Sequence, residues 1–401
     1  MNGRGTQFVT GAVPLAFEPS CPICRSREIV ALKAPHAGRS MVSDGRVLPS
    51  ALRKASCNAC GHGFHLQPPT AEERDGFYDA DYDVGLRDVS ADLLRARQYA
   101  GHIKTALERH DLDLPASPSV IEFGCGSGAL LRLIAEEWNA RRAIGIEPAA
   151  RLAAAARSKA CPKVEILQAF AEGETAALGR HDVALSVNVV EHALDPVAFL
   201  KVQARAVTED GIVVVVCPDG NRAQSELLFL DHLSSFTTSS MSLAATAAGL
   251  CIVARSALDD QQSGFQMFLL RKGLDADDQS QTDHAGLSAA RNSYLRGWSE
   301  MEASTLDAME TKPYAIFGIG EYADLLEAYC PRLTDGAQLY VVDTPGQTER
   351  NGKPVISLEA FRRQGDLIAV AAVNPRNWAF VKRKFSDLPA QIVHPYEFSS
   401  L

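Results

Sequence analysis

The sequence predicts an α/β protein: a zinc-binding module, then a domain with a mostly parallel sheet, then a second, smaller α/β domain. Two observations lead to this prediction. Two C-x-x-C pairs lie within the first 60 residues, and short apolar segments then alternate with helical ones in two series, separated by an acidic, polar stretch at 275–283. Strands that alternate with helices of this length form parallel sheets that helices cover on both faces.

The composition agrees with a globular protein of more than one domain. The chain has 401 residues, of which 46% are hydrophobic and 22% charged, so it can form more than one core and is not mainly disordered. Its net charge is −9 and it has no basic block, which argues against a nucleic-acid partner. Its apolar runs are shorter than the ~18 residues of a membrane helix, and its first residues lack the apolar segment of a secretory signal. We therefore expect a cytoplasmic protein without a membrane partner.

Four of the nine cysteines form the N-terminal pairs, Cys21 with Cys24 and Cys57 with Cys60, and the other five are scattered. An odd total with isolated thiols favours a reducing compartment over a disulfide framework. Two pairs at this spacing can present four thiolates to one tetrahedral ion, so we expect one structural zinc ion per chain. The 32 residues between the pairs imply an inserted hairpin. Two nearby histidines are rival ligands, and ordinary half-buried thiols are the alternative.

The spacing of apolar residues predicts the helices and strands that follow. A helix is expected to begin within 68–74, and another to cover 93–109. The first series predicts strands at 120–123, 142–146, 164–168, 183–188, 211–217, 250–256 and 265–271, and helices at 128–139, 149–160 and 196–206. A connecting helix at 289–309 leads to the second series, with strands from 314 and at 338–342, 367–372 and 391–394. The predicted domains are residues 1–75, 76–275 and 285–401.

A glycine-rich turn after the first strand of the larger domain is the most informative motif. The strand contains Glu122 and ends in Gly124-Cys-Gly-Ser-Gly128, which opens a helix. Glycines let the backbone approach a ligand closely, and the N–H groups of the helix N-terminus point at it. A second acid, Glu147, ends the next strand, where a carboxylate can accept both hydroxyls of a ribose. An NAD-binding site of the Rossmann type is the alternative, since dinucleotide enzymes use a similar turn.

This segment resembles the first motif of the class I S-adenosylmethionine-dependent methyltransferases, which implies a Rossmann-like domain and S-adenosylmethionine as cofactor. By this resemblance the loop glycines bind the amino acid part of the cofactor and Glu147 binds the ribose. Asn188 ends the fourth strand, where the family lines the sulfonium side of the pocket. Phe170 stands near the position of the family's acid beside the adenine. The predicted cofactor-binding residues are Glu122, Gly124, Gly126, Gly128, Glu147, Phe170 and Asn188.

In the order of its parts the whole chain resembles the zinc-containing deoxysugar C-methyltransferases of antibiotic sugar pathways, which act on nucleotide-linked keto-deoxysugars. The best local match is the segment 229–237, Phe-Leu-Asp-His-Leu-Ser-Ser-Phe-Thr, which resembles the family's acidic-His pair. Carbon becomes nucleophilic only when a proton next to a carbonyl is removed. His232 suits that step as general base, with Asp231 assisting it. The alternative is a helix-capping Asp beside a surface His.

Other positions depart from that family, and these departures concern the acceptor rather than methyl transfer. Tyr78 and Tyr82 stand near the family's substrate tyrosine without its flanking Pro and Ser residues. His192 follows the fourth strand, where the family often has a His on the catalytic side, so His192 and Tyr82 are further catalytic candidates. Because Glu-His pairs at this place also occur in methyltransferases of other specificity, a structural or cofactor-side role of His192 is the alternative. The family's lysine-containing glycine loop is replaced by Gly318-Ile-Gly320, which lacks a third glycine. We expect this second loop to belong to a wall that closes over the acceptor rather than to a second cofactor site.

Three hypotheses about function remain. The leading one is a methyltransferase that uses S-adenosylmethionine to methylate a carbon of a small polar acceptor, such as a nucleotide-linked keto-deoxysugar or a related natural-product intermediate. The second transfers the methyl group to oxygen, nitrogen or sulfur of a non-sugar intermediate, which needs less help from a base. The third is a non-catalytic scaffold whose zinc module mediates protein contacts. The intact glycine loop and Glu147 argue against this last hypothesis.

Overall fold

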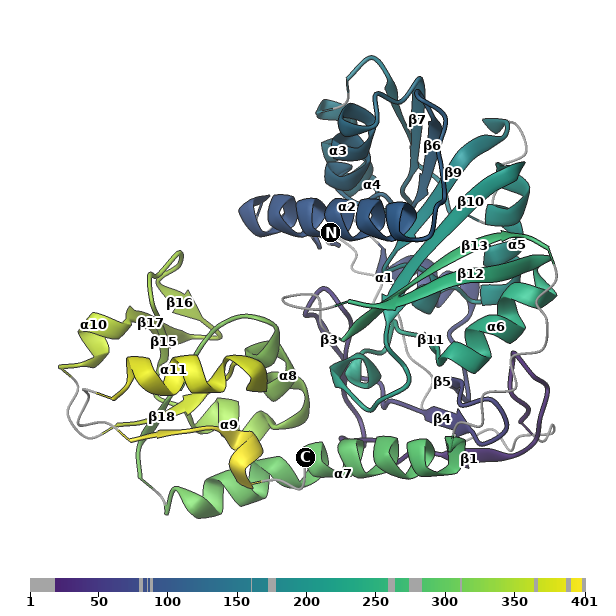
Figure 1. Cartoon of the computed structure of the whole chain (residues 1–401). Coiled ribbons are helices and arrows are strands. Elements are labelled where there is room, and N and C mark those ends of the chain that lie inside the picture. The colour runs from purple at the N-terminus through teal and green to yellow at the C-terminus, as the bar shows by residue number, and fades with distance from the viewer. Residues whose placement is uncertain are drawn as a thin grey trace, which may run out of the picture.

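A computed structural model shows how the chain arranges its strands and helices (Figure 1). It describes residues 19–78, 82–84, 86, 89–159, 161–171, 178–258, 264–273, 283–310, 312–363, 367–386 and 391–398. Within these residues the strands form sheets of four, seven and six strands and one two-stranded hairpin. Residues 275–282 of the expected boundary lie outside the described residues.

The N-terminal cysteine pairs lie at two turns beside a small antiparallel sheet, which includes a strand from the middle of the chain. In spatial order its strands are β1 (Ile29–Ala31), β4 (Lys54–Cys57), β5 (Gly63–His65) and β11 (Ser234–Ser235). The expected hairpin between the cysteine pairs is present as β2 (Ser40–Met41) and β3 (Val47–Leu48). Because β11 follows His232 by only two residues, its pairing with β5 ties this sheet to the segment that carries the predicted base.

Seven strands make up the largest sheet of the described residues, in the spatial order β12, β13, β10, β9, β6, β7, β8. Its strands are β6 (Ser119–Phe123), β7 (Arg142–Ile146), β8 (Val164–Leu167), β9 (His181–Val187), β10 (Val207–Pro218), β12 (Leu250–Ala257) and β13 (Phe265–Lys272). Every strand predicted for this series is present, and five neighbouring strands are parallel, but β13 runs antiparallel to both of its neighbours. Only seven residues separate β12 from β13, too few for the helical crossover that a parallel pair requires.

Helices cover both faces of the seven-stranded sheet, because adjacent residues of a strand point to opposite faces. In β6, for example, Val120 packs in a core with Leu131, whereas Ile121 packs in a different core with Phe199. The helices of this part are α1 (Ala71–Phe77), α2 (Val89–Arg109), α3 (Ala129–Glu137), α4 (Ala150–Ser158), α5 (Pro196–Ala206) and α6 (Thr238–Ala247). Two short 3-10 helices, η2 (Val190–His192) and η3 (Ser225–Leu228), follow β9 and β10.

The C-terminal part begins with the long helix α7 (His284–Ala308), which runs from beneath the small sheet to the C-terminal sheet (Figure 1). The strands of that sheet, in spatial order, are β16 (Glu349–Arg350), β17 (Lys353–Ser357), β15 (Tyr340–Val342), β14 (Tyr314–Phe317), β18 (Ile368–Ala371) and β19 (Ile392–Val393). Its helices are α8 (Glu321–Tyr329), α9 (Pro331–Gly336), α10 (Leu358–Phe361) and α11 (Trp378–Lys384). The prediction lacks β16, which consists of two charged residues, and β17, whose apolar run is only Val355-Ile356 and follows a proline.

One hydrophobic core joins the inserted hairpin to the C-terminal part. It contains Met41 of β2, Leu228 of η3, Trp298 of α7 and Ile316 of β14, all of them almost fully buried. The hairpin is therefore not a separate appendage, since its apolar side chains pack against helices and strands from three other regions. In the part of the chain that the structure describes, no helix has both the length and the apolar character needed to cross a membrane.

Candidate cofactor and acceptor site

The glycine-rich turn between β6 and α3 folds against the end of the neighbouring strand β7. The N–H groups of Gly124 and Cys125 both donate to the backbone oxygen of Ile146, at 2.7 and 3.0 Å. Gly124 has a φ of +71°, and a Cβ atom at this position would lie 2.5 Å from Cγ2 of Val189. A residue with a side chain would therefore meet both backbone strain and a clash here.

Glu147 directly follows β7 and is held by the same turn. Its Oε2 accepts a hydrogen bond from the Gly126 N–H at 2.8 Å, and its Oε1 accepts one from the Ala149 N–H at 2.9 Å. Burial raises the pKa of Glu147 to about 7, although the two backbone donors act in the opposite direction. Each carboxylate oxygen has a second lone pair, so Glu147 can accept further hydrogen bonds from a ligand.

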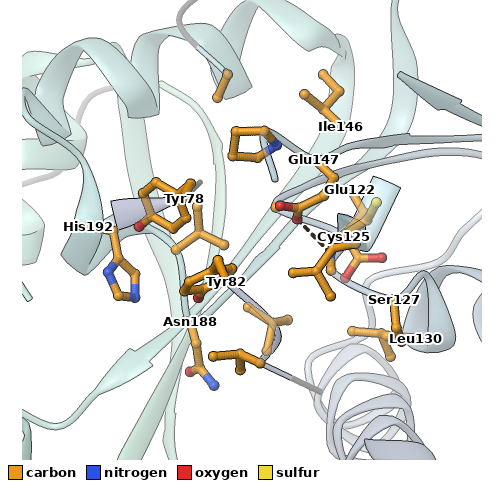
Figure 2. Close-up of a pocket in the computed structure, with 18 of the residues that line it drawn as sticks. Tyr78, Tyr82, Glu122, Cys125, Ser127, Leu130, Ile146, Glu147, Asn188 and His192 are labelled. Atoms are coloured by element: carbon orange, nitrogen blue, oxygen red, sulfur yellow. Dashed lines mark hydrogen bonds between the residues drawn. The ribbon is translucent and has the colours of Figure 1, made fainter. Parts of the chain in front are cut away.

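A cavity of about 230 Å³ lies at the carboxyl ends of β6, β7 and β9 (Figure 2). Ligands of open α/β sheets bind at this edge. Six of the seven predicted cofactor-binding residues line the cavity: Glu122, Gly124, Gly126, Glu147, Phe170 and Asn188. Gly128 does not line it. This residue caps α3, and a Cβ atom there would lie 3.1 Å from Cβ of Ala156 in α4, so its position serves the packing of the two helices.

Two polar side chains in the cavity wall have buried atoms without a hydrogen-bond partner. Asn188 donates from Nδ2 to the Tyr99 hydroxyl at 3.1 Å, and its Oδ1 is unpartnered. Glu122 is 3% exposed with Oε2 unpartnered, and burial, with the nearby Glu147, raises its pKa well above its ordinary value. A buried polar atom without a partner costs free energy. The unpartnered oxygens and the glycine turn therefore fit a polar ligand of the nucleoside type.

His192, in η2, lines the same cavity (Figure 2). Its Nδ1 lies 2.9 Å from the backbone oxygen of Asp231. A carbonyl oxygen only accepts, so Nδ1 carries the hydrogen, and the neutral ring keeps its lone pair on Nε2. Burial lowers the pKa of His192 to about 4; Asp231 raises it and His232 lowers it further. His192 is thus neutral at pH 7 and can accept a proton at Nε2.

The predicted base, His232, and its partner Asp231 lie beside His192 and do not line the cavity. His232 packs edge-to-face on His192, with ring centroids 4.8 Å apart, and its Nδ1 lies 3.9 Å from Oε2 of Glu226. Asp231 is 2% exposed and His232 is 8% exposed. The alternative of a capping Asp beside a surface His is therefore wrong. The cap of the following helix, α6, is Thr237.

Tyr78 and Tyr82 line the cavity together with His192 (Figure 2). The two tyrosine rings have centroids 4.9 Å apart, and the Tyr78 ring meets the His192 ring edge-on at 6.3 Å. Burial raises the pKa of both tyrosines. Both therefore keep their hydroxyl hydrogen at neutral pH and can donate it to an oxygen of a ligand.

The four N-terminal cysteines converge on one point. The Sγ atoms of Cys21 and Cys60 are 3.7 Å apart, those of Cys24 and Cys57 are 3.5 Å apart, and all four lie within 4.8 Å of one another. These distances exclude disulfides, whose S–S bond is about 2.05 Å. A tetrahedral ion with Zn–S bonds of about 2.3 Å holds its sulfurs about 3.8 Å apart. The cluster thus fits one such ion, and neither His62 nor His65 belongs to it.

The glycine loop of the C-terminal sheet does not fit a phosphate. Gly318 has a φ of +108° and approaches the backbone oxygen of Ala372 closely, because a Cβ atom there would lie 2.7 Å from it. Gly320 caps α8, whose first turn carries Glu321 and Asp324. Carboxylates at a helix N-terminus occupy the place that an anionic ligand would take, which argues against a second dinucleotide site.

Several residues in and around the site are absent from the sequence prediction, among them Asp92, Tyr99 and Ser43. Asp92 accepts a hydrogen bond from the Ser127 hydroxyl at 2.5 Å, Tyr99 accepts one from Asn188, and Ser43 binds Asp231. Asp92 and Tyr99 are seven residues apart on α2 and share one face of that helix, so polar residues on its apolar face are the signal that identifies them. Ser43 has no such signal, because only the folded hairpin brings it to Asp231.

Comparisons with known proteins agree with this geometry. Residues 92–255 match the family model described as a methyltransferase domain, and these residues contain the glycine turn, Glu147, Asn188 and His192. No curated protein matches the sequence.

Among solved structures, the chain is similar to the Haloferax volcanii complex of the Trm112 methyltransferase activator with a methyltransferase, with 17% identity, coverage of 51% of this chain and 100% of that chain, and a TM-score of 0.40. The mitomycin 7-O-methyltransferase MmcR gives 18% identity, coverage of 50% and 60%, and a TM-score of 0.40. An S-adenosylmethionine-dependent methyltransferase from Mesorhizobium loti gives 17% identity, coverage of 42% and 96%, and a TM-score of 0.35.

Proposed function

We propose, from the premise that this chain is an enzyme with an S-adenosylmethionine-dependent methyltransferase domain at residues 92–255, that it methylates a carbon atom of a small polar acceptor. The observation that carries the proposal is one cavity wall that combines the Glu147–Gly126 turn with the neutral imidazole of His192. The first feature suits a nucleoside cofactor, and the second suits removal of a proton from the acceptor.

The cofactor side of the proposal rests on the residues at the carboxyl ends of the strands. Glu147 would accept the ribose hydroxyls, and the N–H groups of the glycine turn would face the amino acid part. The unpartnered oxygens of Asn188 and Glu122 would accept hydrogen bonds from the cofactor's ammonium group or from water bound beside it. S-adenosylmethionine, when bound, supplies a methyl group that its sulfonium has already activated.

On the acceptor side, we assign the general base to His192 rather than to His232. His192 lines the cavity and presents a lone pair at Nε2, because its Nδ1 donates to the Asp231 carbonyl. His232 is one ring contact away, which leaves it as the second candidate. Tyr78 and Tyr82 would donate hydrogen bonds to the oxygen next to the reacting carbon and so stabilise an enolate.

The acceptor class follows from this chemistry. A carbon acceptor needs an acidic proton next to a carbonyl, and a keto-deoxysugar carried by a nucleotide has one. The resemblance of the whole chain to the deoxysugar C-methyltransferases supports the same class. We further propose that Cys21, Cys24, Cys57 and Cys60 hold a structural zinc ion, which their Sγ distances support.

Two measurements test the proposal in turn. Calorimetric titration with S-adenosylhomocysteine should show one site per chain, and no binding would favour the non-catalytic scaffold. The enzyme is then incubated with methyl-deuterated S-adenosylmethionine and a panel of nucleotide-linked keto-deoxysugars. NMR of the product should locate the label on carbon; a label on oxygen, nitrogen or sulfur would support the heteroatom hypothesis instead.

A further inference from the structure

The hairpin inserted between the two cysteine pairs reaches the wall of the candidate site. Its first strand, β2, lies alongside residues 229–230, where the Leu230 N–H donates to the backbone oxygen of Met41 at 2.7 Å. The turn after β2 is closed by the Val42 N–H, which donates to the Arg46 oxygen at 3.0 Å. Asp44 braces this turn by accepting hydrogen bonds from the N–H and Nε of Arg46 at 3.0 and 2.5 Å. The backbone of the turn is therefore fixed next to Asp231.

Ser43, in this turn, engages both oxygens of the Asp231 carboxylate. Its backbone N–H donates to Oδ1 at 2.9 Å, and its hydroxyl donates to Oδ2 at 2.5 Å. Asp231 is 2% exposed, and buried polar oxygens need hydrogen-bond donors. Ser43 therefore stabilises the carboxylate and also fixes its rotation.

That rotation matters because Asp231 presents two acceptors to the same nitrogen of His192. The backbone oxygen accepts the Nδ1 hydrogen at 2.9 Å, whereas the carboxylate Oδ2 lies 3.6 Å from Nδ1. Oδ2 is also the oxygen that accepts the hydrogen bond from the Ser43 hydroxyl. Without that hydroxyl, the carboxylate could rotate toward His192. Oδ2 would then replace the neutral backbone carbonyl as the acceptor of the hydrogen bond from Nδ1.

We propose that Ser43, although it belongs to the metal-binding module, is a positioning residue of the candidate active site. Ser43 holds the Asp231 carboxylate away from His192, and the His192 imidazole therefore stays neutral and directed at the cavity. This inference rests on the proposed function in one respect, the role of His192 as base. The hairpin would then connect the cysteine module to methyl transfer. A second contact supports this connection, because Lys54 of β4 donates from Nζ to the backbone oxygen of His232 at 2.9 Å.

The experiment measures the protonation of His192 directly. Protein labelled with ¹⁵N-histidine and saturated with S-adenosylhomocysteine is titrated by NMR between pH 5 and 8, and the His192 signals are assigned by their loss in His192→Gln. Besides Asp231, the titratable groups that face His192 are His232, Lys54 and Tyr78, and Glu191 precedes it in η2. None of these is altered in the Ser43 variants.

In the parent protein His192 should remain neutral throughout the titration. Ser43→Ala should raise its pKa by about 1 to 3, as expected when a carboxylate moves into direct contact, so that its signals titrate within the measured range. Ser43→Thr, which keeps the hydroxyl, should restore the parent behaviour. Ser50→Ala, a serine that follows the hairpin and does not bind Asp231, is the matched control.

An unchanged pKa of His192 in Ser43→Ala, with unchanged metal content and cofactor affinity, would overturn the proposal. If Ser43→Ala does not fold, Ser43→Cys keeps the size of the side chain with only a weak donor and must show the same rise. The readout needs no acceptor and no methyl transfer. A label found on a heteroatom would therefore refute the proposed reaction while leaving this inference intact. An unchanged pKa of His192 in Ser43→Ala, together with a label on carbon, would refute this inference and leave the proposed reaction intact.

Discussion

The Oε2 atom of Glu147 accepts a hydrogen bond from the Gly126 N–H at 2.8 Å, which links the end of β7 to the turn that ends β6. Through this contact the acid that would bind the ribose also fixes the backbone that would face the rest of the cofactor. The binding of S-adenosylhomocysteine should therefore respond to any change of charge or shape at either residue.

The charge of Glu147 predicts how cofactor binding depends on pH. Burial raises its pKa to about 7, so the carboxylate gains a proton, and loses acceptor capacity, as the pH falls through 7. The affinity for S-adenosylhomocysteine should fall by up to about tenfold per pH unit below 7. Calorimetry at pH 5.5 to 8.5 measures this change of affinity with pH. Glu147→Gln should bind S-adenosylhomocysteine more weakly at pH 8, and its affinity should not change with pH in this way. An identical slope in Glu147→Gln would assign the proton to another group.

The same raised pKa predicts an effect on stability with a defined sign. A carboxyl group whose pKa is higher in the folded than in the unfolded state favours folding below its unfolded value of about 4.5. This contribution is lost as the pH rises to about 7. Glu147→Gln should therefore gain stability relative to the parent protein between pH 5 and 8, as measured by urea unfolding without cofactor. A constant difference over that range would contradict the prediction.

The close approach at Gly124 predicts a loss of binding on substitution. In Gly124→Val the new Cβ would meet Cγ2 of Val189 at 2.5 Å in a backbone with positive φ, so the turn must move away from the cofactor. Calorimetry should show that binding of S-adenosylhomocysteine is abolished. Gly249→Ala is the matched control, because Gly249 has a φ of +77° and no atom within 4 Å of a Cβ. Equal loss of binding in both variants would implicate backbone strain in general.

The four-cysteine cluster predicts one zinc ion per chain, measured by mass spectrometry of freshly purified protein. Cys57→Ser should lose most of the metal and lower the stability of the N-terminal module, since structural zinc contributes about 10 kcal/mol or more of folding free energy. Binding of S-adenosylhomocysteine should remain, because no cysteine of the cluster lines the cavity. Cys161→Ser, at an exposed thiol, should keep its metal. A full zinc content in Cys57→Ser would contradict the assignment.

The buried hydrogen bonds of Arg291 in α7 predict a large contribution of this residue to stability, because they join the cysteine module to α7. It is fully buried and donates to the hydroxyl of Ser56 and to the backbone oxygens of Gly61 and Gly220, at 2.9, 2.8 and 2.6 Å. Arg291→Ala should cost about 3 kcal/mol or more in urea unfolding, because it leaves buried acceptors unpaired. Arg296→Ala, at a half-exposed arginine on the same helix, should cost less than about 1 kcal/mol.

The sequence predicts the elements around the candidate cofactor site well because their signals are local. Each strand of the seven-stranded sheet is a short apolar run, and Gly124, Gly126 and Glu147 stand at fixed distances from strand ends. The direction of β13 is not local in this sense, since it depends on the short connection to β12.

The acceptor side is harder to predict because it is assembled from distant segments. His192 and His232 are 40 positions apart and are both next to an acid in the sequence; only the fold shows which of them lines the cavity. Likewise, nothing near Ser43 in the sequence indicates Asp231, which lies 188 residues away. The resemblance to a known family therefore indicated both histidine segments but not which histidine lies on the cavity.

The central claim, a histidine that removes a proton from an acceptor carbon, is tested most directly by hydrogen exchange in D₂O. Enzyme saturated with S-adenosylhomocysteine is mixed with each nucleotide-linked keto-deoxysugar of the panel, and NMR follows the proton next to the carbonyl. The parent enzyme should exchange this proton for deuterium in at least one compound, His192→Gln should slow the exchange by about 10²- to 10⁴-fold, and His232→Gln should slow it less. Full exchange in His192→Gln, or none in the parent enzyme with any compound, would contradict the claim.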